Sequence, residues 1–189
     1  MCVADFDGDG VEDIFLSQNF FDVDSTTSRY DAGRGLLLRG DGQGAFHAVP
    51  GQHSGVRVYG EQRGAAVCDF DGDARVDLVV TQNSTETRLF HNTQAKPGLR
   101  IRLDGPPGNP RGIGAILRLK FGDRFGPARE VHAGSGYWSQ DSVVQVMTTP
   151  TPCTGLWIRW PGGKTATLDL PPNPLEIRVS FDGGLQKVR

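Results

Sequence analysis

The chain has 189 residues, with 22 acidic and 20 basic side chains and a formal net charge of −2. Its length is enough to bury a hydrophobic core in one or two domains. The near-neutral charge and the lack of a basic run give no indication of nucleic-acid binding, and no apolar run approaches the roughly 18 residues of a membrane span. The 26 glycines and 12 prolines favour many turns and short strands over long helices.

Cysteine usage leaves the cellular compartment open. The three cysteines, Cys2, Cys68 and Cys153, are too few and too odd in number for a disulfide framework. We expect them to be small buried thiols. Alternatively, Cys2 and Cys68 pair with each other if their strands are neighbours.

The N-terminal segment contains an aspartate-rich turn followed by a short apolar run. Residues 5–19 read Asp-Phe-Asp-Gly-Asp-Gly-Val-Glu-Asp-Ile-Phe-Leu-Ser-Gln-Asn, and the pattern recurs 64 residues later at 69–83 with eight of fifteen positions identical. The apolar runs at 14–16 and 78–80 are bounded by turn residues, which predicts short strands buried on both faces. The chain therefore contains an internal repeat.

A second, weaker block extends each repeat. Residues 37–40 resemble residues 89–92 at a shorter offset, so we interpret 20–35 as a loop insertion in the first unit. Short strands around an acidic turn, repeated at this spacing, are typical of propeller blades. Two blades cannot close a propeller, which needs about four to eight. We therefore expect a piece of a longer protein, or self-association through open blade edges.

The pattern changes near residues 95–98, and the repeat does not return. Residues 99–103 and 115–121 alternate apolar with polar side chains, and no later segment has a helical period. We predict an all-β fold, with two propeller-type blades (a partial β-propeller) in residues 1–95. Residues 96–189 are then a small antiparallel β-sandwich or barrel domain.

The two aspartate turns have the composition of calcium sites. Calcium takes six to eight oxygen ligands, mostly carboxylates and carbonyls, and carboxylates at alternate positions of a tight turn repel one another without a cation. The predicted ligands are the side chains of Asp5, Asp7, Asp9 and Asp13 with the carbonyl of Val11, and the side chains of Asp69, Asp71, Asp73 and Asp77 with the carbonyl of Arg75. The alternative is a pair of solvated turns without metal.

The EF-hand interpretation fails at the twelfth position of each turn. An EF-hand needs a bidentate Glu there, whereas Leu16 and Val80 occupy it inside apolar strands. The two turns also differ at the sixth position, where Gly10 tolerates a positive φ and Ala74 pays roughly 1 kcal/mol or more for it. We therefore expect weaker calcium binding at the second turn.

The first half resembles the FG-GAP repeat, also called the VCBS repeat, of integrin-α-type β-propellers. The residues behind the resemblance are Asp-Phe-Asp-Gly-Asp-Gly-x-x-Asp with its apolar strand, and the segment 39–46, which resembles the turn before the next blade. The resemblance covers roughly residues 1–95. It implies calcium held in loops between adjacent strands of a blade, with a mainly structural role.

The second half resembles the ASPIC/UnbV domain that commonly follows such propellers, as in the cartilage acidic protein family. The matching residues are Asn109, Gly112 to Ala115, Arg129 to Val131, Gly134 to Gln140 and Trp160 to Gly163. The family usually has a Phe-Gly-Leu-Gly turn after the Ser-Gln pair, whereas this chain has Val146 to Pro150 there. The resemblance implies a fold and a context more than a reaction.

We expect a calcium-binding structural or protein-interaction module of a secreted or cell-surface protein, without catalytic residues. One alternative is an accessory or enzymatic protein of a biosynthetic pathway, because UnbV-like domains are similar to proteins encoded near such pathways. Its ligand site would lie around Arg129, Glu130, His132 and Gln140. Another alternative is a glycan-binding surface formed by Tyr137, Trp138, Trp157 and Trp160.

Overall fold

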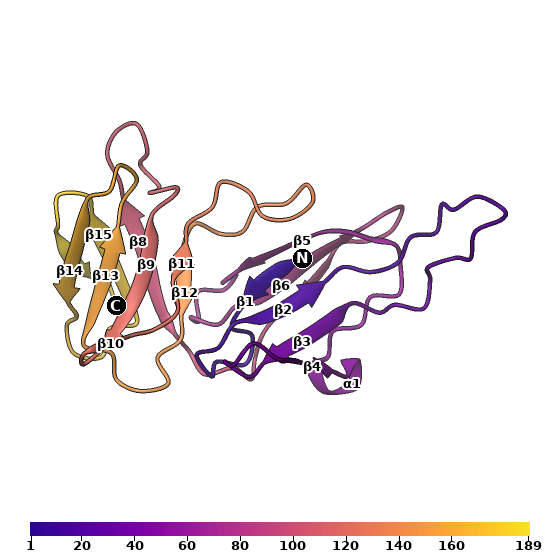
Figure 1. Ribbon diagram of the computed structural model, residues 1–189, viewed down its shortest axis with the longest axis horizontal. Helices are drawn as coiled ribbons and strands as arrows, with labels where there is room; N and C mark the ends of the chain where they lie inside the picture. Colours follow the sequence, from indigo (N-terminus) through magenta and orange to yellow (C-terminus); the bar gives the residue numbers. More distant parts are fainter.

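The computed structural model describes all residues 1–189. The chain forms sixteen strands and one four-residue helix, α1 (Gly51–Ser54). The strands build four small sheets in a propeller-like arrangement, which Figure 1 shows along the length of an elongated molecule. The all-β prediction is confirmed.

The first sheet contains the first aspartate turn. Its four strands run in the order β1-β2-β3-β4, all antiparallel. Their bounds are β1 (Cys2–Ala4), β2 (Asp13–Leu16), β3 (Leu36–Gly40) and β4 (Phe46–Val49). The aspartate turn joins β1 to β2, and the pair Ala4↔Asp13 closes it.

The second sheet repeats this arrangement with three strands, β5 (Gln62–Cys68), β6 (Asp77–Gln82) and β7 (Arg88–Phe90). The second aspartate turn joins β5 to β6, closed by the pair Cys68↔Asp77. Five residues separate β6 from β7, whereas the segment between β2 and β3 is long and projects from the body of the molecule (Figure 1). This segment is the insertion that the shorter repeat offset predicts.

The C-terminal half contributes the other two sheets. One has the order β10-β9-β13-β14, with β11 also paired to β9, and the other has the order β12-β8-β15-β16. Their strands are β8 (Leu99–Asp104), β9 (Ile116–Phe121), β10 (Arg124–Phe125), β11 (Arg129–Glu130), β12 (Gln145–Met147), β13 (Gly155–Arg159), β14 (Thr165–Asp169), β15 (Glu176–Ser180) and β16 (Leu185–Lys187). The prediction of a purely antiparallel half is wrong, because β15 runs parallel to β8.

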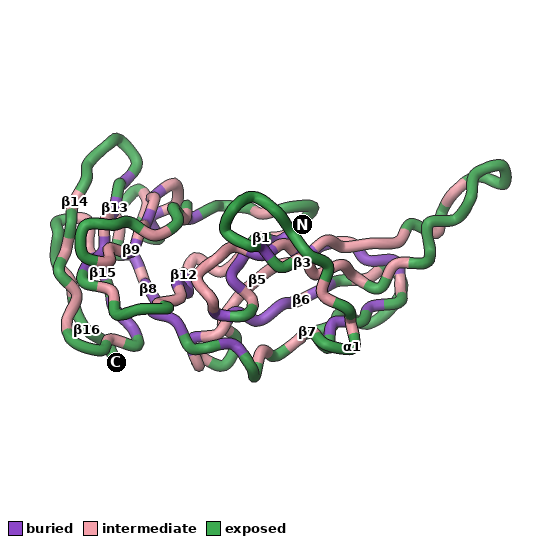
Figure 2. The backbone as a smooth tube through the Cα atoms, turned by 60° about the horizontal axis from the view of Figure 1, so that its bottom comes forward, coloured by how far each residue is buried: buried purple, intermediate pink, exposed green.

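The apolar side chains gather in two main cores. Thirteen buried residues from the last two sheets, including Trp160 and Ile158, form the larger core. Seven buried residues around Phe15 and Val80 form the core of the first two sheets. Figure 2 shows buried residues along strands of both halves, while the insertion between β2 and β3 is largely exposed.

The two halves are packed against each other. Ala4, Val76 and Val146 form a third buried cluster across the junction. Beside it, the N–H of Val67 donates to Asp141 Oδ1 at 2.8 Å and its carbonyl accepts from the N–H of Ser142 at 2.9 Å. The structure therefore corrects the expectation of two blades followed by a separate sandwich: four small sheets form one packed body, in which the loop residues Asp141 and Ser142 hydrogen-bond to β5.

The cysteine side chains form no disulfide. All three cysteines are free, so the alternative pairing of Cys2 with Cys68 is absent. Cys2 is buried, and burial raises the pKa of its thiol to about 12. No helix of the chain is long and apolar enough to cross a membrane.

Candidate functional site

The first aspartate turn is organised around Asp5, which is buried at the end of β1. Its carboxylate accepts backbone N–H groups from Gly8 at 2.8 Å, Asp9 at 3.1 Å and Gly10 at 2.8 Å. These bonds hold the turn closed, as a short acidic side chain does when it satisfies nearby backbone donors. Gly10 is required here, since its φ is +90° and a Cβ would lie 2.9 Å from Cγ of Pro150.

Three carboxylates converge inside this turn. Oxygens of Asp5, Asp7 and Asp13 all lie within 4.8 Å of one another. Asp13, at the start of β2, is buried and accepts the N–H groups of Phe6 and Gly40 at 2.9 Å each. An all-oxygen group of this kind can hold a hard metal ion.

Burial and repulsion between carboxylates raise the pKa of two carboxyl groups in the first turn. Burial raises the pKa of Asp13 to about 6 in spite of its two backbone hydrogen bonds, and the charges of Asp7 and Asp5 add to the increase. Burial and the charge of Asp9 raise the pKa of Asp7 above its ordinary value. A bound cation would relieve both effects, because it favours the charged form of each carboxyl.

Asp9 does not belong to this group of three carboxylates, and the predicted carbonyl ligand of Val11 stays a prediction. The N–H of Val11 donates to Asp9 Oδ1 at 2.9 Å. The other oxygen of Asp9 accepts Nη2 of Arg39 at 2.8 Å, and Nε of Arg39 lies 2.7 Å from Oδ2 of Asp7. Arg39 reaches over from β3 and is half exposed, so this cation neutralises only the outer side of the turn.

The second turn repeats the backbone design. Asp69 accepts the N–H groups of Gly72 at 2.8 Å and Ala74 at 2.9 Å, while Asp77 accepts those of Phe70 and Asn92 at 2.8 and 2.7 Å. Oxygens of Asp69, Asp71 and Asp77 again lie within 4.8 Å of one another, so this group can also hold a metal ion. Ala74 adopts a φ of +67°, the left-handed conformation that the alignment with Gly10 predicts.

The second turn differs in that protein cations already face its carboxylates. Arg100, from β8, hydrogen-bonds through Nη1 to Asp69 and through Nε to Glu176 at 2.9 Å. All three of these side chains are at least nine-tenths buried. Arg75, expected to contribute only its carbonyl, pairs with Asp73 through its side chain.

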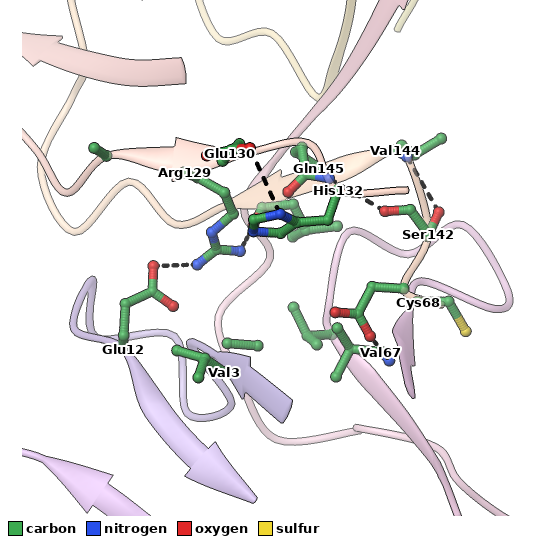
Figure 3. Close-up of a pocket in the computed structure, with 15 residues that line it drawn as sticks. Val3, Glu12, Val67, Cys68, Arg129, Glu130, His132, Ser142, Val144 and Gln145 are labelled. Atoms are coloured by element: carbon green, nitrogen blue, oxygen red, sulfur yellow. Dashed lines mark hydrogen bonds and ion pairs between the residues drawn. The ribbon is translucent and has the colours of Figure 1, made fainter. Parts of the chain in front are cut away.

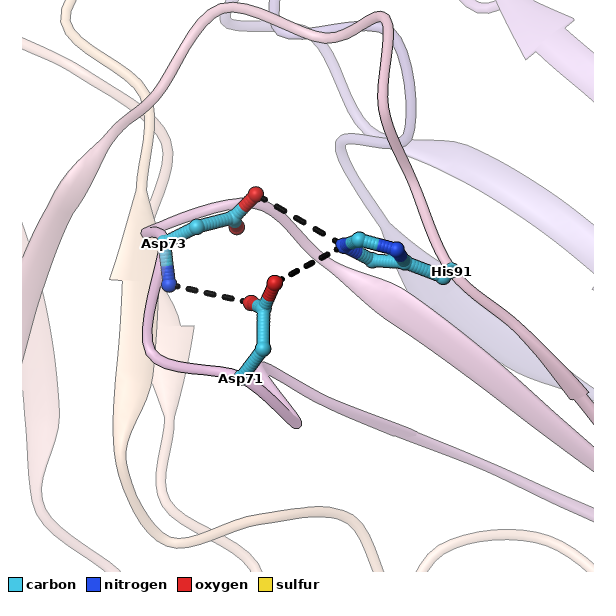
Figure 4. A group of neighbouring side chains, drawn as sticks. All are labelled: Asp71, Asp73 and His91. Carbon is cyan, nitrogen blue, oxygen red and sulfur yellow. Dashed lines mark hydrogen bonds and ion pairs between the residues drawn. The ribbon is translucent and has the colours of Figure 1, made fainter.

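His91 lies beside the second turn, at the end of β7. Its Nε2 is 2.9 Å from Oδ2 of Asp71 and 3.8 Å from Oδ2 of Asp73 (Figure 4). These three residues also lie within 4.8 Å of one another. Because Arg75 already binds Asp73, this group is less free to take a further cation than the carboxylates of the first turn.

The sequence analysis missed the basic partners of both turns. Arg39 and His91 occupy matching positions in the weaker repeat block, which is a signal that they face corresponding carboxylates. Arg100 carries no such signal. It comes from the other half of the chain, and only the fold brings it to Asp69.

A cavity of about 190 Å³ lies at the junction of the two halves, between β1 and β5 on one side and β11 and β12 on the other (Figure 3). Three of the four predicted ligand-binding residues, Arg129, Glu130 and His132, line it. Gln140 does not, and lines a neighbouring hollow instead. Arg129 pairs with Glu12 and also donates through Nη1 to the carbonyl of Val146 at 3.2 Å.

The four aromatic residues considered for glycan binding do not share one surface. Trp160 is buried in the larger core against Phe181, with ring centroids 5.4 Å apart. Tyr137 and Trp138 lie together in an exposed loop, with ring centroids 6.1 Å apart. Trp157 lies apart from them on β13.

Neither a comparison with protein-family models nor a comparison with curated protein sequences finds a match to this chain.

Proposed function

We propose that the chain is a calcium-binding structural or protein-interaction module, and that the first aspartate turn is its principal calcium site. The observation that carries this proposal is the convergence of Asp5, Asp7 and Asp13, of which only Asp7 pairs with a protein cation, the half-exposed Arg39. Like charges held this close, with burial raising the pKa of two of them, favour a bound cation.

The donor set favours calcium over softer metals. Side chains of the first turn offer oxygen only, and oxygen ligands suit calcium and magnesium rather than zinc or copper. Calcium also accepts irregular geometry with six to eight ligands, whereas magnesium demands a near-ideal octahedron. Asp5, Asp7 and Asp13 would hold the ion, with Asp9 and the carbonyl of Val11 as the further predicted ligands.

The ion's role would be structural. Asp5 directly follows β1 and Asp13 begins β2, so a cation between the two carboxylates would tie neighbouring strands together and offset the repulsion between those carboxylates. The resemblance of residues 1–95 to FG-GAP/VCBS repeats supports this role. In the same proposal the last two sheets, which enclose one core, form an ASPIC/UnbV-like β domain over residues 96–189.

A secreted or cell-surface location is part of this proposal. Its support is the family resemblance of residues 1–95. Calcium sites of extracellular modules bind at about 10⁻⁴–10⁻³ M, and we expect an affinity in that range. Protein or glycan partners, and self-association through open sheet edges, remain predictions of the sequence.

Thermal unfolding with calcium, magnesium or a chelator tests the proposal. Calcium at about 100 times its dissociation constant stabilises a folded protein by about 2.7 kcal/mol, which corresponds to a rise in Tm of about 5–10 °C for a chain of this size. Asp13→Asn should abolish the rise, while the matched Asp77→Asn should leave most of it. A melt that the chelator does not change would sink the proposal.

A further inference from the structure

The cavity at the junction of the two halves carries an excess of negative charge. Three carboxylates line it, those of Glu12, Glu130 and Asp141, against the single guanidinium of Arg129. His132 is the only other titratable base on its wall, and its Nδ1 lies 3.7 Å from Oε1 of Glu130. With a neutral imidazole, the formal charge of the lining is therefore three negative and one positive.

The guanidinium of Arg129 already has hydrogen-bond partners within the protein. Nη2 of Arg129 binds Oε1 of Glu12, and Nη1 donates to the carbonyl of Val146 at 3.2 Å (Figure 3). Arg129 is thus held by the protein on both sides and is not free to bind an anion. Asp141 Oδ1 is occupied by the N–H of Val67 at 2.8 Å.

One acceptor at the cavity wall has no donor. Oε2 of Glu12 is buried and accepts no hydrogen bond. A buried carboxylate oxygen without a hydrogen-bond donor destabilises the folded state, and bulk water does not reach this one. A small rotation about χ3 of Glu12, a torsion with broad preferences, would bring Oε2 within reach of a donor held in the cavity.

Much of the remaining lining is aliphatic, beside Ser142 and Gln145, and the space is small. Side chains of Val3, Val67, Val76, Val144 and Val146 form the apolar part of the wall. A volume of about 190 Å³ is slightly larger than the roughly 150 Å³ of a dry cavity that admits benzene. The space therefore suits a body of about six to eight non-hydrogen atoms.

From this charge, acceptor and shape, we propose that the cavity is a binding site for a small primary ammonium ion with a short aliphatic body. The ammonium group donates to Glu12 in a charge-assisted hydrogen bond, and the aliphatic body lies against the valines. Glu130 and Asp141 supply the remaining negative field. This site does not depend on the calcium proposal, since none of the four aspartates of the first turn lines the cavity.

An NMR titration of the full chain with n-pentylammonium, 1-pentanol and pentanoate tests the site. These probes match in length and differ in charge. The ammonium ion should shift the amide signals of Val67, Val144 and Val146, and bind at least about tenfold more tightly than the alcohol. Pentanoate should not bind. Equal affinity for the alcohol, tighter binding of pentanoate, or no shifts with the ammonium ion would each overturn the proposal.

Two variants locate the interaction. Glu12→Gln keeps an acceptor for Arg129 and removes the charge, so it should weaken ammonium binding by about tenfold or more. Glu86→Gln, an exposed site far from the cavity, is the matched control and should change nothing. Should Glu12→Gln fail to fold, Val144→Phe keeps every charge, fills the space and should abolish binding; unchanged affinity in that variant refutes the site.

The titration is run both with saturating calcium and with a chelator. The ammonium-induced shifts should appear in both. Their presence alongside a melt that is insensitive to calcium would remove the calcium proposal and leave the cavity site standing, and the reverse pattern would remove only the cavity site.

Discussion

The two aspartate turns share one backbone design and differ in what neutralises their charge. In each, the first aspartate accepts backbone N–H groups of the turn, and the last one accepts one from the turn and one from Gly40 or Asn92 of the third strand region. The first turn then meets one half-exposed arginine, Arg39, at its outer side. The second meets Arg100, Arg75 and His91. Similar motifs therefore need not be equal metal sites, because charges at variable positions of the motif, such as Arg75, and outside it, such as Arg100, also decide.

Arg100 accounts for the largest difference in charge neutralisation between the two turns. It lies buried between Asp69 and Glu176, and Glu176 also contacts Arg102 at 2.6 Å and Arg189 at 3.2 Å. This network joins the second turn to β8 and β15. We infer that the second turn serves more as an attachment point between the halves, while the first is better suited to a cation.

The largest effect is expected from Arg100→Met. Removing one member of a buried ion pair leaves an uncompensated charge, here that of Asp69, and typically costs about 3–5 kcal/mol. Urea unfolding in chelator should show this loss. Added calcium should recover part of it, because the freed Asp69 can then join Asp71 and Asp77 around an ion.

Arg39→Met is the matched control in the first turn. Exposed ion pairs are worth at most about 1 kcal/mol, so this variant should change the free energy of unfolding little and should strengthen calcium binding slightly. Equal losses in the two variants would show that the turns are neutralised alike.

The next effect is on the pH dependence of the free energy of unfolding, which should have opposite signs for Asp13 in the first turn and for Glu176 beside the second. Burial raises the pKa of Asp13 to about 6, from an ordinary value of 3.8. Between about pH 4 and pH 6 the folded state then binds more protons than the unfolded chain, so the free energy of unfolding of the calcium-free protein falls as pH rises. The expected fall from this residue is about 2–3 kcal/mol.

Glu176 behaves in the opposite way. Burial alone would raise its pKa, but hydrogen bonds from Arg102 and Arg100 lower it to about 2, from 4.5. Its contribution to stability is therefore lost as pH falls from about 4.5 towards 2. Urea unfolding across pH 2–7 should separate the two windows. In Asp13→Asn, and with saturating calcium, the fall between about pH 4 and pH 6 should disappear; its persistence in the variant would contradict the assignment to Asp13.

The smallest effect concerns the sixth position of each turn. Gly10→Ala places a Cβ at a positive φ and 2.9 Å from Pro150, and should lower the free energy of unfolding by about 1–2 kcal/mol. Ala74→Gly relieves a strained φ of +67° but loses a buried methyl group, so its effect should stay within about 1 kcal/mol. Chemical denaturation of both variants measures the two changes in the free energy of unfolding. A larger change for Ala74→Gly than for Gly10→Ala would contradict this prediction.

Local patterns predicted the local structure well. The repeated aspartate motif and its apolar runs placed β1, β2, β5 and β6, and the shorter offset of the second block located the insertion before β3. The alignment of Gly10 with Ala74 predicted the positive φ of the alanine. Each of these features depends on residues close together in the chain.

The features that sequence analysis missed depend on contacts between distant segments. Arg39 reaches Asp7 and Asp9 from β3, and Arg100 reaches Asp69 only because β8 packs beside the second turn. The parallel pairing of β8 with β15, and the covering of β5 by Asp141 and Ser142, likewise arise from the packing of the two halves. No periodicity within a strand encodes such contacts.

Calcium titration calorimetry on the wild-type chain, Asp7→Asn and Asp71→Asn tests the inequality of the two turns most directly. The two aspartates occupy matching positions and are similarly exposed. We expect one dominant binding event, at least about tenfold tighter than any second, that disappears in Asp7→Asn and survives in Asp71→Asn. Two events of equal affinity, or loss of the dominant event in Asp71→Asn, would contradict the difference between the turns.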